Sequence, residues 1–177
     1  CLSHDIVVHE TAHALLDDQF AAVVDTNRIA GQTWAVPWYV DTRLQFYRKD
    51  MFARAGYEAP PLDWAGWKAA LHRVKAAAGD GNYAVLLSVN EFEQLLTIAL
   101  SAGARLLRDR NARGAFSDPA FKAALAFYKS LFDEKLAPVV SATQISNIWN
   151  EFARGFFSIF TSGPWTIGDM KRRLPAA

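Results

Sequence analysis

The sequence predicts an α/β fold in which helices flank a small mixed sheet, giving a three-layer lobe. Three runs with the pattern of strands, near residues 34–47, 83–88 and 156–161, alternate with segments whose apolar residues recur at helical spacing. Of the 177 residues, 51% are apolar and 21% are charged, which is the composition of a globular domain. A chain of this length can bury a substantial core.

Charge and cysteine content argue against several classes of protein. The formal net charge is +1, which does not favour a nucleic-acid or membrane-surface role driven by bulk electrostatics. No apolar run approaches about 18 residues, so we expect no transmembrane span. Cys1 is the only cysteine, so an internal disulfide is excluded. A basic and apolar leader is also missing, and we expect a mature form or a fragment of a longer protein.

The amino-terminal segment contains a motif of zinc enzymes. The pattern predicts a helix from His4 to Phe20, within which His9, Glu10 and His13 form the HExxH motif HETAH. On a helix both histidines face the same way, so they could bind one Zn²⁺ while Glu10 acts as a base toward a metal-bound water. The flanking residues also resemble the active-site helix of zinc metallopeptidases.

A third zinc ligand is missing from this pattern. The extended motif HExxHxxGxxH needs glycine and histidine where the chain has Leu16 and Gln19, and the next glutamate is Glu58. Catalytic zinc normally has three protein ligands. We therefore prefer the structural alternative, an amphipathic helix with solvated or hydrogen-bonded histidines. No cofactor is expected, with zinc as the alternative.

The stretch from Gly31 to Asp50 has the most informative pattern in the chain. Pro37 belongs at a strand edge or a bend, and beyond it alternation places Tyr39, Asp41 and Arg43 on one face of an extended segment. That face carries rings, a carboxylate and a guanidinium, while the other face is apolar. Such a surface is typical of a cleft for polar small molecules. A half-buried strand with solvated polar residues is the structural alternative.

Local signals define the elements around this stretch. Residues 21–32 have the character of a polar connector, and 49–55 that of a short helix. Asp63 is placed to N-cap a helix from about Trp64 to Ala78. The apolar run from Tyr83 to Ser88 follows a turn and is predicted to be a buried strand.

The next segment combines structural and functional candidates. Periodicity predicts a helix from Glu91 to Ala102, and Asn90 and Glu93 have the spacing of a capping box, which is their structural explanation. The basic run from Arg105 to Arg113 is predicted to be a solvated loop.

A strong helix start follows at Asp118, where a capping residue precedes proline. Helical spacing then predicts four core residues, Phe121, Leu125, Tyr128 and Phe132.

The carboxyl-terminal part predicts a helix from Ser146, a buried strand from Phe156 to Thr161, and a last helix after the Gly163-Pro164-Trp165 turn. A rigid turn can hold the indole of Trp165 toward a cleft, and the C–H faces of a pyranose pack well on aromatic faces. Core packing is the alternative for this tryptophan.

Five motifs resemble, in the same order, segments of the family 1 solute-binding proteins of ABC transporters, the type that includes maltose-binding proteins. They are PWYVDTR, YRKDMFARAG, the PP..W helix, the DP..AL.FYK helix and the GPW turn. The similarity runs from about Val23 to Arg173. It implies a lobe of the periplasmic-binding-protein type II kind, corresponding to most of the second lobe of a longer protein that holds its ligand between two lobes.

The resemblance also implies a function. It indicates the non-catalytic sugar-binding component of an ABC importer, or a fragment of one, which would engage permease subunits when full length. The implied location is periplasmic or extracellular, with a lipoprotein anchor as an option for the full-length form. The implied ligand-binding residues are Trp38, Tyr39 and Trp165 for stacking, and Asp41, Arg43, Asn90, Glu91, Glu93 and Gln94 for hydroxyl groups.

The first 22 residues stand apart from this resemblance. We expect two parts, residues 1–22 with the HETAH helix and residues 23–177 with the partial solute-binding lobe. The competing hypothesis is a zinc-dependent metallopeptidase with His9 and His13 as ligands and Glu10 as base. Which sugar is bound cannot be derived from the sequence, because hydroxyl specificity depends on cleft geometry.

Overall fold

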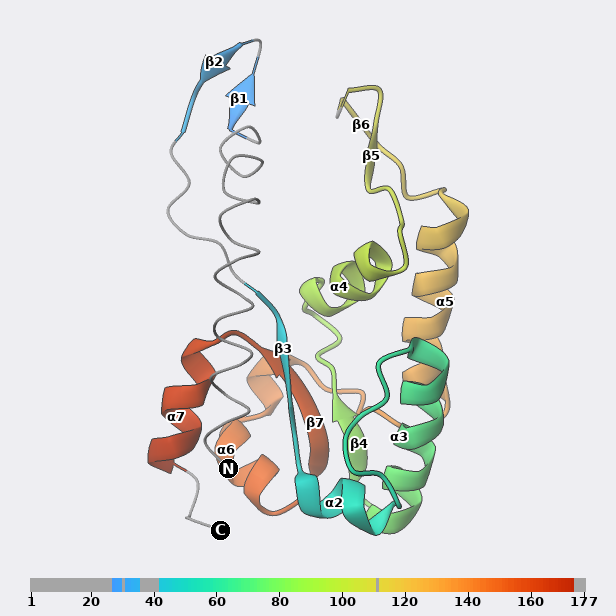
Figure 1. The fold of residues 1–177 in the computed structure, drawn as a ribbon, viewed down its shortest axis with the longest axis vertical. Helices are drawn as coiled ribbons and strands as arrows, with labels where there is room; N and C mark the ends of the chain where they lie inside the picture. The colour runs from blue at the N-terminus through green and yellow to red at the C-terminus, as the bar shows by residue number, and fades with distance from the viewer. Residues whose placement is uncertain (1–26, 30, 36–41, 111, 174–177) are drawn as a thin grey trace. The chain divides into compact units, whose positions relative to one another are not determined.

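The computed structural model describes residues 27–29, 31–35, 42–110 and 112–173 (Figure 1). The predicted helix from His4 to Phe20 lies outside these residues, as does the 36–41 part of the predicted first strand. The chain divides into two compact units, residues 1–42 and residues 43–177. Each is described by itself.

The first unit contains a short antiparallel hairpin. Its strands are β1 (Arg28–Ile29) and β2 (Gln32–Thr33), with Arg28 opposite Thr33. Gly31 has φ of 80°, a backbone conformation that glycine adopts without strain. The amide of Trp34 donates to the carbonyl of Asn27 at 3.0 Å and closes the hairpin. The described end of the polar connector predicted over 21–32 thus contains a short hairpin.

The second unit is built on a three-stranded mixed sheet, as predicted. The strands are β3 (Leu44–Tyr47), β4 (Tyr83–Leu86) and β7 (Phe157–Ser162), in the order β3-β7-β4. The central strand β7 pairs antiparallel with β3 and parallel with β4. Its run from Phe157 to Phe160 is buried, which is expected for a strand covered on both faces.

Helices cover both faces of this sheet (Figure 1). In chain order the helices are α2 (Lys49–Arg54), α3 (Trp64–Ala78), α4 (Glu93–Ser101), α5 (Pro119–Asp133), the 3₁₀ turn η1 (Ala142–Gln144), α6 (Ile148–Ala153) and α7 (Trp165–Arg173). On one face Leu71 of α3 and Leu131 of α5 pack with Ile159 of β7. On the other face Phe152 of α6 packs with Phe160 of β7. These two clusters give the predicted three layers.

The two longest helices begin where capping chemistry predicted. Asp63 accepts a hydrogen bond from the Gly66 amide at 2.7 Å and starts α3. Asp118 accepts from the Ala120 amide at 2.9 Å, with Pro119 as the first residue of α5. A side-chain oxygen at the N-cap satisfies amides that have no partner inside the helix, so these starts are set locally.

The structure overturns two local predictions and refines a third. The capping box of Asn90 and Glu93 is wrong, because α4 starts at Glu93 after Phe92 and has no side-chain cap. The solvated turn predicted over 105–113 is exposed and is closed by a short hairpin, in which β5 (Leu107–Arg108) pairs with β6 (Arg113–Gly114). Leu125 is 44% exposed, because α5 turns Phe121, Ala124 and Leu131 inward instead.

No helix in the described part of the chain has both the length and the apolar character needed to cross a membrane.

Candidate functional site

One edge of the sheet gathers most of the described site candidates. Strands β4 and β7 are parallel, so their carboxyl ends lie at the same edge, and the antiparallel strand β3 begins there. Leu44 lies opposite Ser162, which brings the preceding Arg43 beside the turn that follows β7. In open α/β sheets, ligands bind in the crevice outside the carboxyl ends of the strands.

Trp165 stands at this edge as the first residue of α7. Its side chain is exposed, at 53%, which contradicts core packing. The indole folds back over Gly163, so that a Cβ atom at position 163 would lie 2.1 Å from two ring carbons. The hydroxyl of Thr166 donates to the Ser162 hydroxyl at 2.7 Å and ties the start of α7 to the end of β7. Glycine at 163 is thus required for this position of the ring.

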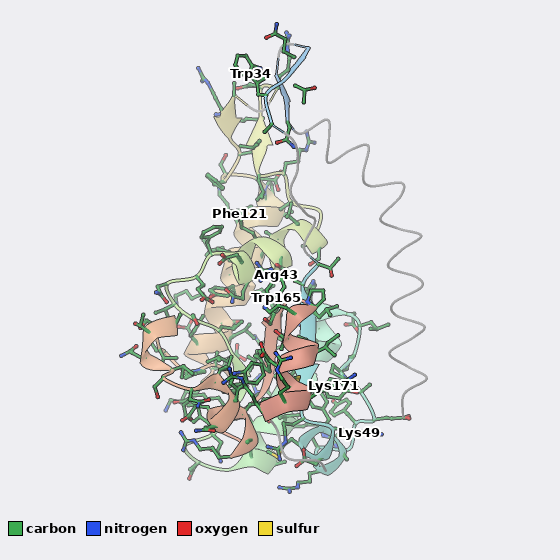
Figure 2. The ribbon with its side chains drawn as sticks, turned by 90° about the vertical axis from the view of Figure 1, so that its left-hand side faces the viewer. Trp34, Arg43, Lys49, Phe121, Trp165 and Lys171 are labelled. Atoms are coloured by element: carbon green, nitrogen blue, oxygen red, sulfur yellow. The ribbon has the colours of Figure 1, made fainter. Side chains whose placement is uncertain are left out.

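Arg43 lies against the same ring. Its guanidinium carbon is 5.9 Å from the centroid of the Trp165 ring, a cation–π distance, and Figure 2 shows the two residues next to each other. The sequence predicted both residues as binding candidates. The cross-strand register explains why they meet although 122 positions of sequence separate them.

A cavity of about 220 Å³ opens on the α3 face of the sheet beside Arg43. Its polar lining includes Arg43, Gln45, Gln94, Thr97 and Thr161, and two tryptophans, Trp64 and Trp67, supply ring surface. The indole N–H of Trp67 donates to Gln45 Oε1 at 3.0 Å, and that of Trp64 to Ser101 Oγ at 3.1 Å. The indole donors are therefore occupied.

Gln94 carries an acceptor that lacks a protein partner. Its Nε2 donates to Glu91 Oε2 at 3.0 Å, but its buried Oε1 has no hydrogen bond from the described residues. Buried polar atoms are nearly always satisfied by protein, water or ligand. Gln94 lines the cavity, but this oxygen itself has almost no accessible surface.

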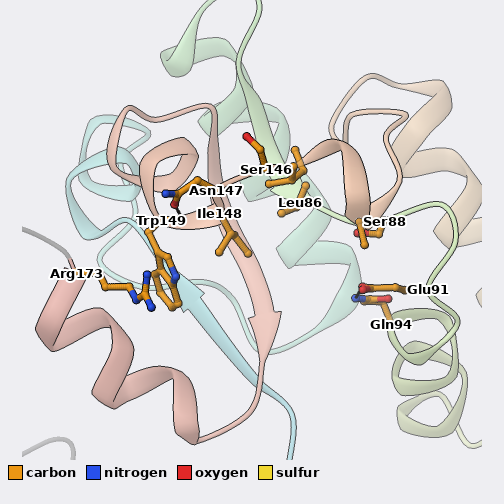
Figure 3. Close-up of a pocket in the computed structure, with 11 residues that line it drawn as sticks. Leu86, Ser88, Glu91, Gln94, Ser146, Asn147, Ile148, Trp149 and Arg173 are labelled. Carbon is orange, nitrogen blue, oxygen red and sulfur yellow. Dashed lines mark hydrogen bonds between the residues drawn. The ribbon is translucent and has the colours of Figure 1, made fainter.

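A second cavity, of about 420 Å³, lies on the α6 side (Figure 3). Glu91 and Gln94 form one wall, and Trp149 and Arg173 lie at the other side. Glu91 also affects the interior residue Tyr128, whose hydroxyl donates to the Ser88 carbonyl at 3.3 Å. Burial raises the pKa of Tyr128, and the charge of Glu91 raises it further.

The remaining candidates divide into two groups. Asn90 is used structurally, because its Oδ1 accepts a hydrogen bond from the Ala142 amide at 2.9 Å. Glu93 lines neither of these two cavities. The candidates outside the described residues are Trp38, Tyr39, Asp41, His9, Glu10 and His13.

Some cavity residues were missed by sequence reasoning. The helical spacing of Trp64 and Trp67 is that of residues packed in a core, and it gives no sign of a cavity. No sequence pattern marked Arg173 as a cavity residue. Among the described residues, no three His, Cys, Asp or Glu side chains come close enough to hold a metal ion.

Residues 8–173 match the family model described as "Bacterial extracellular solute-binding protein". The matched range includes the HETAH segment, and the likeness of that segment to a metallopeptidase helix has no support from these comparisons. The mannitol-binding protein of Pseudomonas aeruginosa is 30% identical over 165 residues, which are 86% of this chain and 34% of that protein.

Solved structures show the same fold. The sugar-binding protein MalE from Xanthomonas citri is 45% identical, with a TM-score of 0.79 over 86% of this chain and 39% of that one. The GacH receptor of Streptomyces glaucescens is 28% identical, with a TM-score of 0.69 over 85% of this chain and 38% of that one. The chain thus spans little more than a third of the length of these relatives. With this sheet and these matches, the chain belongs to the bacterial extracellular solute-binding protein family.

Proposed function

We propose that the chain is a large part of one lobe of a sugar-binding protein that serves an ABC importer and is not an enzyme. The observation that carries the proposal is the meeting of Arg43 and the exposed Trp165 at one sheet edge, which brings a cation and ring surface together beside a cavity. MalE, the relative described as sugar-binding, supports the ligand class.

In this proposal the exposed indole of Trp165 stacks on the apolar face of a sugar ring. Arg43 donates a hydrogen bond to a sugar hydroxyl. Trp38, Tyr39 and Asp41 would add stacking and hydroxyl contacts, as the sequence predicts. We propose no resident cofactor.

The length of the chain sets an expectation for affinity. Closure of two lobes around a ligand is the usual way in which periplasmic binding proteins hold it. Because this chain spans little more than a third of its relatives, its residues supply only part of the contacts, and binding by the chain alone should be weak. Permease subunits and a periplasmic or lipid-anchored location belong to the full-length protein in this proposal.

Replacing Trp165 by alanine tests the proposal. The variant should bind maltotriose or mannitol at least about tenfold more weakly, because it loses the stacking surface. Isothermal titration calorimetry measures the loss. Phe116→Ala, at an exposed ring outside both cavities, is the matched control and should bind as the original chain does. Equal affinity of Trp165→Ala and the original chain would contradict the proposal.

Elemental analysis tests the alternative carried by the HETAH motif. Stoichiometric zinc that is lost in His13→Ala, together with chelator-sensitive peptide cleavage, would replace the proposed function by a metallopeptidase.

A further inference from the structure

We propose that this site selects sugars that carry an anionic group, with Arg43 as the residue that binds the anion. The inference rests on the proposed function and specifies its substrate class. It starts from the charge of the α3-side cavity. Arg43 is the only charged side chain among the described residues that line it, and Asp41, proposed above as a contact for sugar hydroxyls, lies outside the described residues.

Arg43 also lacks an acidic partner. Other basic side chains of the lobe hold carboxylates, with Arg48 at 2.7 Å from Asp50 and Lys68 at 2.6 Å from Glu134. Arg43 forms no ion pair with any residue that the structure describes, and its recorded contact is the Trp165 ring. A guanidinium on an aromatic face still has its N–H donors free in the plane of the group.

The surroundings of Arg43 match a sugar acid better than a free anion. The exposed indole beside the guanidinium offers a surface for a ring. A ligand that satisfies both groups has a sugar ring and an anionic substituent. The nearby acid Glu91 does not cancel this preference, because it lines the cavity on the α6 side and accepts from Gln94.

The chemistry of arginine gives the direction of selectivity. A charge-assisted hydrogen bond from guanidinium to carboxylate or phosphate is about twice as strong as a neutral one, and it can be bidentate. A neutral sugar could use the same donors only through weaker bonds to hydroxyl oxygens. We therefore expect the anionic sugar to bind roughly tenfold more tightly than its neutral parent.

Three probes on one scaffold test the inference: glucose, glucuronate and glucose 6-phosphate. The 177-residue chain is titrated with each at low salt, and the shifts of the Arg43 Nε–H and Trp165 indole N–H signals are followed by NMR. We expect tighter binding of one or both anions than of glucose, with both signals moving. A response to glucuronate alone identifies a carboxylate site, and a response to both anions identifies a general anionic sugar site.

Variants separate this inference from the function on which it rests. Arg43→Gln should abolish the preference for the anion, so that glucose and both anions bind equally and more weakly than to the original chain, and Arg43→Lys should keep part of the preference. Arg105→Gln, at an exposed arginine outside both cavities, should behave as the original chain does. Three outcomes would overturn the inference and leave sugar binding intact. They are equal binding of glucose and both anions by the original chain, binding of maltotriose alone, and a preference for the anion that survives in Arg43→Gln. A folded chain that binds none of these sugars would overturn both.

Discussion

The two parallel strands β4 and β7 end at the same edge of the sheet, but the residues that follow them are used differently. After β7, Gly163 has no side chain and so leaves room for the ring of Trp165, which stays exposed. After β4, Asn90 bonds to the Ala142 amide and Glu91 bonds to Gln94. Polar residues at the end of β4 are thus occupied by the protein itself, while the aromatic ring after β7 stays exposed.

This contrast has a physical reason. A polar side chain near the backbone of a neighbouring segment gains free energy by satisfying that segment's amides. An indole that is held by a glycine turn and one helix start has no second apolar surface to cover it. Only Arg43 lies against its ring among the described contacts.

We expect the largest effect from Gly163→Ala, which changes the turn after β7. The new Cβ would meet the indole at 2.1 Å, so the ring must leave its place. Because the ring is exposed and can rotate into solvent, we expect little change in the free energy of unfolding and a large loss of binding. Binding of maltotriose should fall as far as in Trp165→Ala. Urea denaturation and calorimetry measure the two effects.

Gly168→Ala is the matched control in the same helix. The nearest atom to its new Cβ is the Nη1 of Arg172 at 3.3 Å, the end of a flexible side chain. We expect a gain of up to about 1 kcal/mol, because alanine is the better helix former. Normal sugar binding by Gly163→Ala would show that the turn does not position the ring.

Asn90→Ala tests whether the β4 end is structural. Loss of the bond to the Ala142 amide should cost roughly 0.5–1.5 kcal/mol of stability. Sugar affinity should hardly change, since this side chain is already occupied. Asn90→Asp keeps the acceptor and should remain close to the original stability. A large loss of affinity with unchanged stability would make Asn90 a binding residue after all.

Glu91→Gln has the smallest expected effect and acts on Tyr128. Burial raises the pKa of Tyr128 first, and the charge of Glu91 adds to the rise. A raised tyrosine pKa favours the neutral form in the folded state. The associated stability is therefore present below about pH 10, the pKa of unfolded tyrosine, and is lost as the pH rises through the folded value.

In Glu91→Gln the phenolate should form at a lower pH than in the original chain, although burial keeps the pKa above that of free tyrosine. Ultraviolet titration of the phenolate measures the change. Because the folded-state pKa of Tyr128 then lies closer to that of unfolded tyrosine, the variant should lose less stability at alkaline pH. Glu134→Gln, which removes a carboxylate bound to Lys68 and His72, is the control that should leave Tyr128 unchanged. If the phenolate of Glu91→Gln titrated as in the original chain, Glu91 would have no effect on the pKa of Tyr128.

Several features of the molecule were determined by the sequence alone. Asp63 and Asp118 start their helices because a carboxylate satisfies amides that are two or three residues away. The three strands and the family also follow from local patterns, since apolar runs and turn motifs are continuous in sequence. The rigid turn before the last helix indicated that Trp165 could be held toward a cleft; its ring is exposed, and its contact with a sugar stays a prediction.

Only the tertiary structure decided how the site is assembled. Asn90 finds its partner at Ala142, far along the chain, and the pairing of β3 with β7 places Arg43 over Trp165. The unsatisfied Gln94 oxygen and the clash at position 163 depend on the same long-range geometry. Local periodicity records which residues can form a helix or strand, but it does not record which hydrogen-bond partners and rings the fold brings against them.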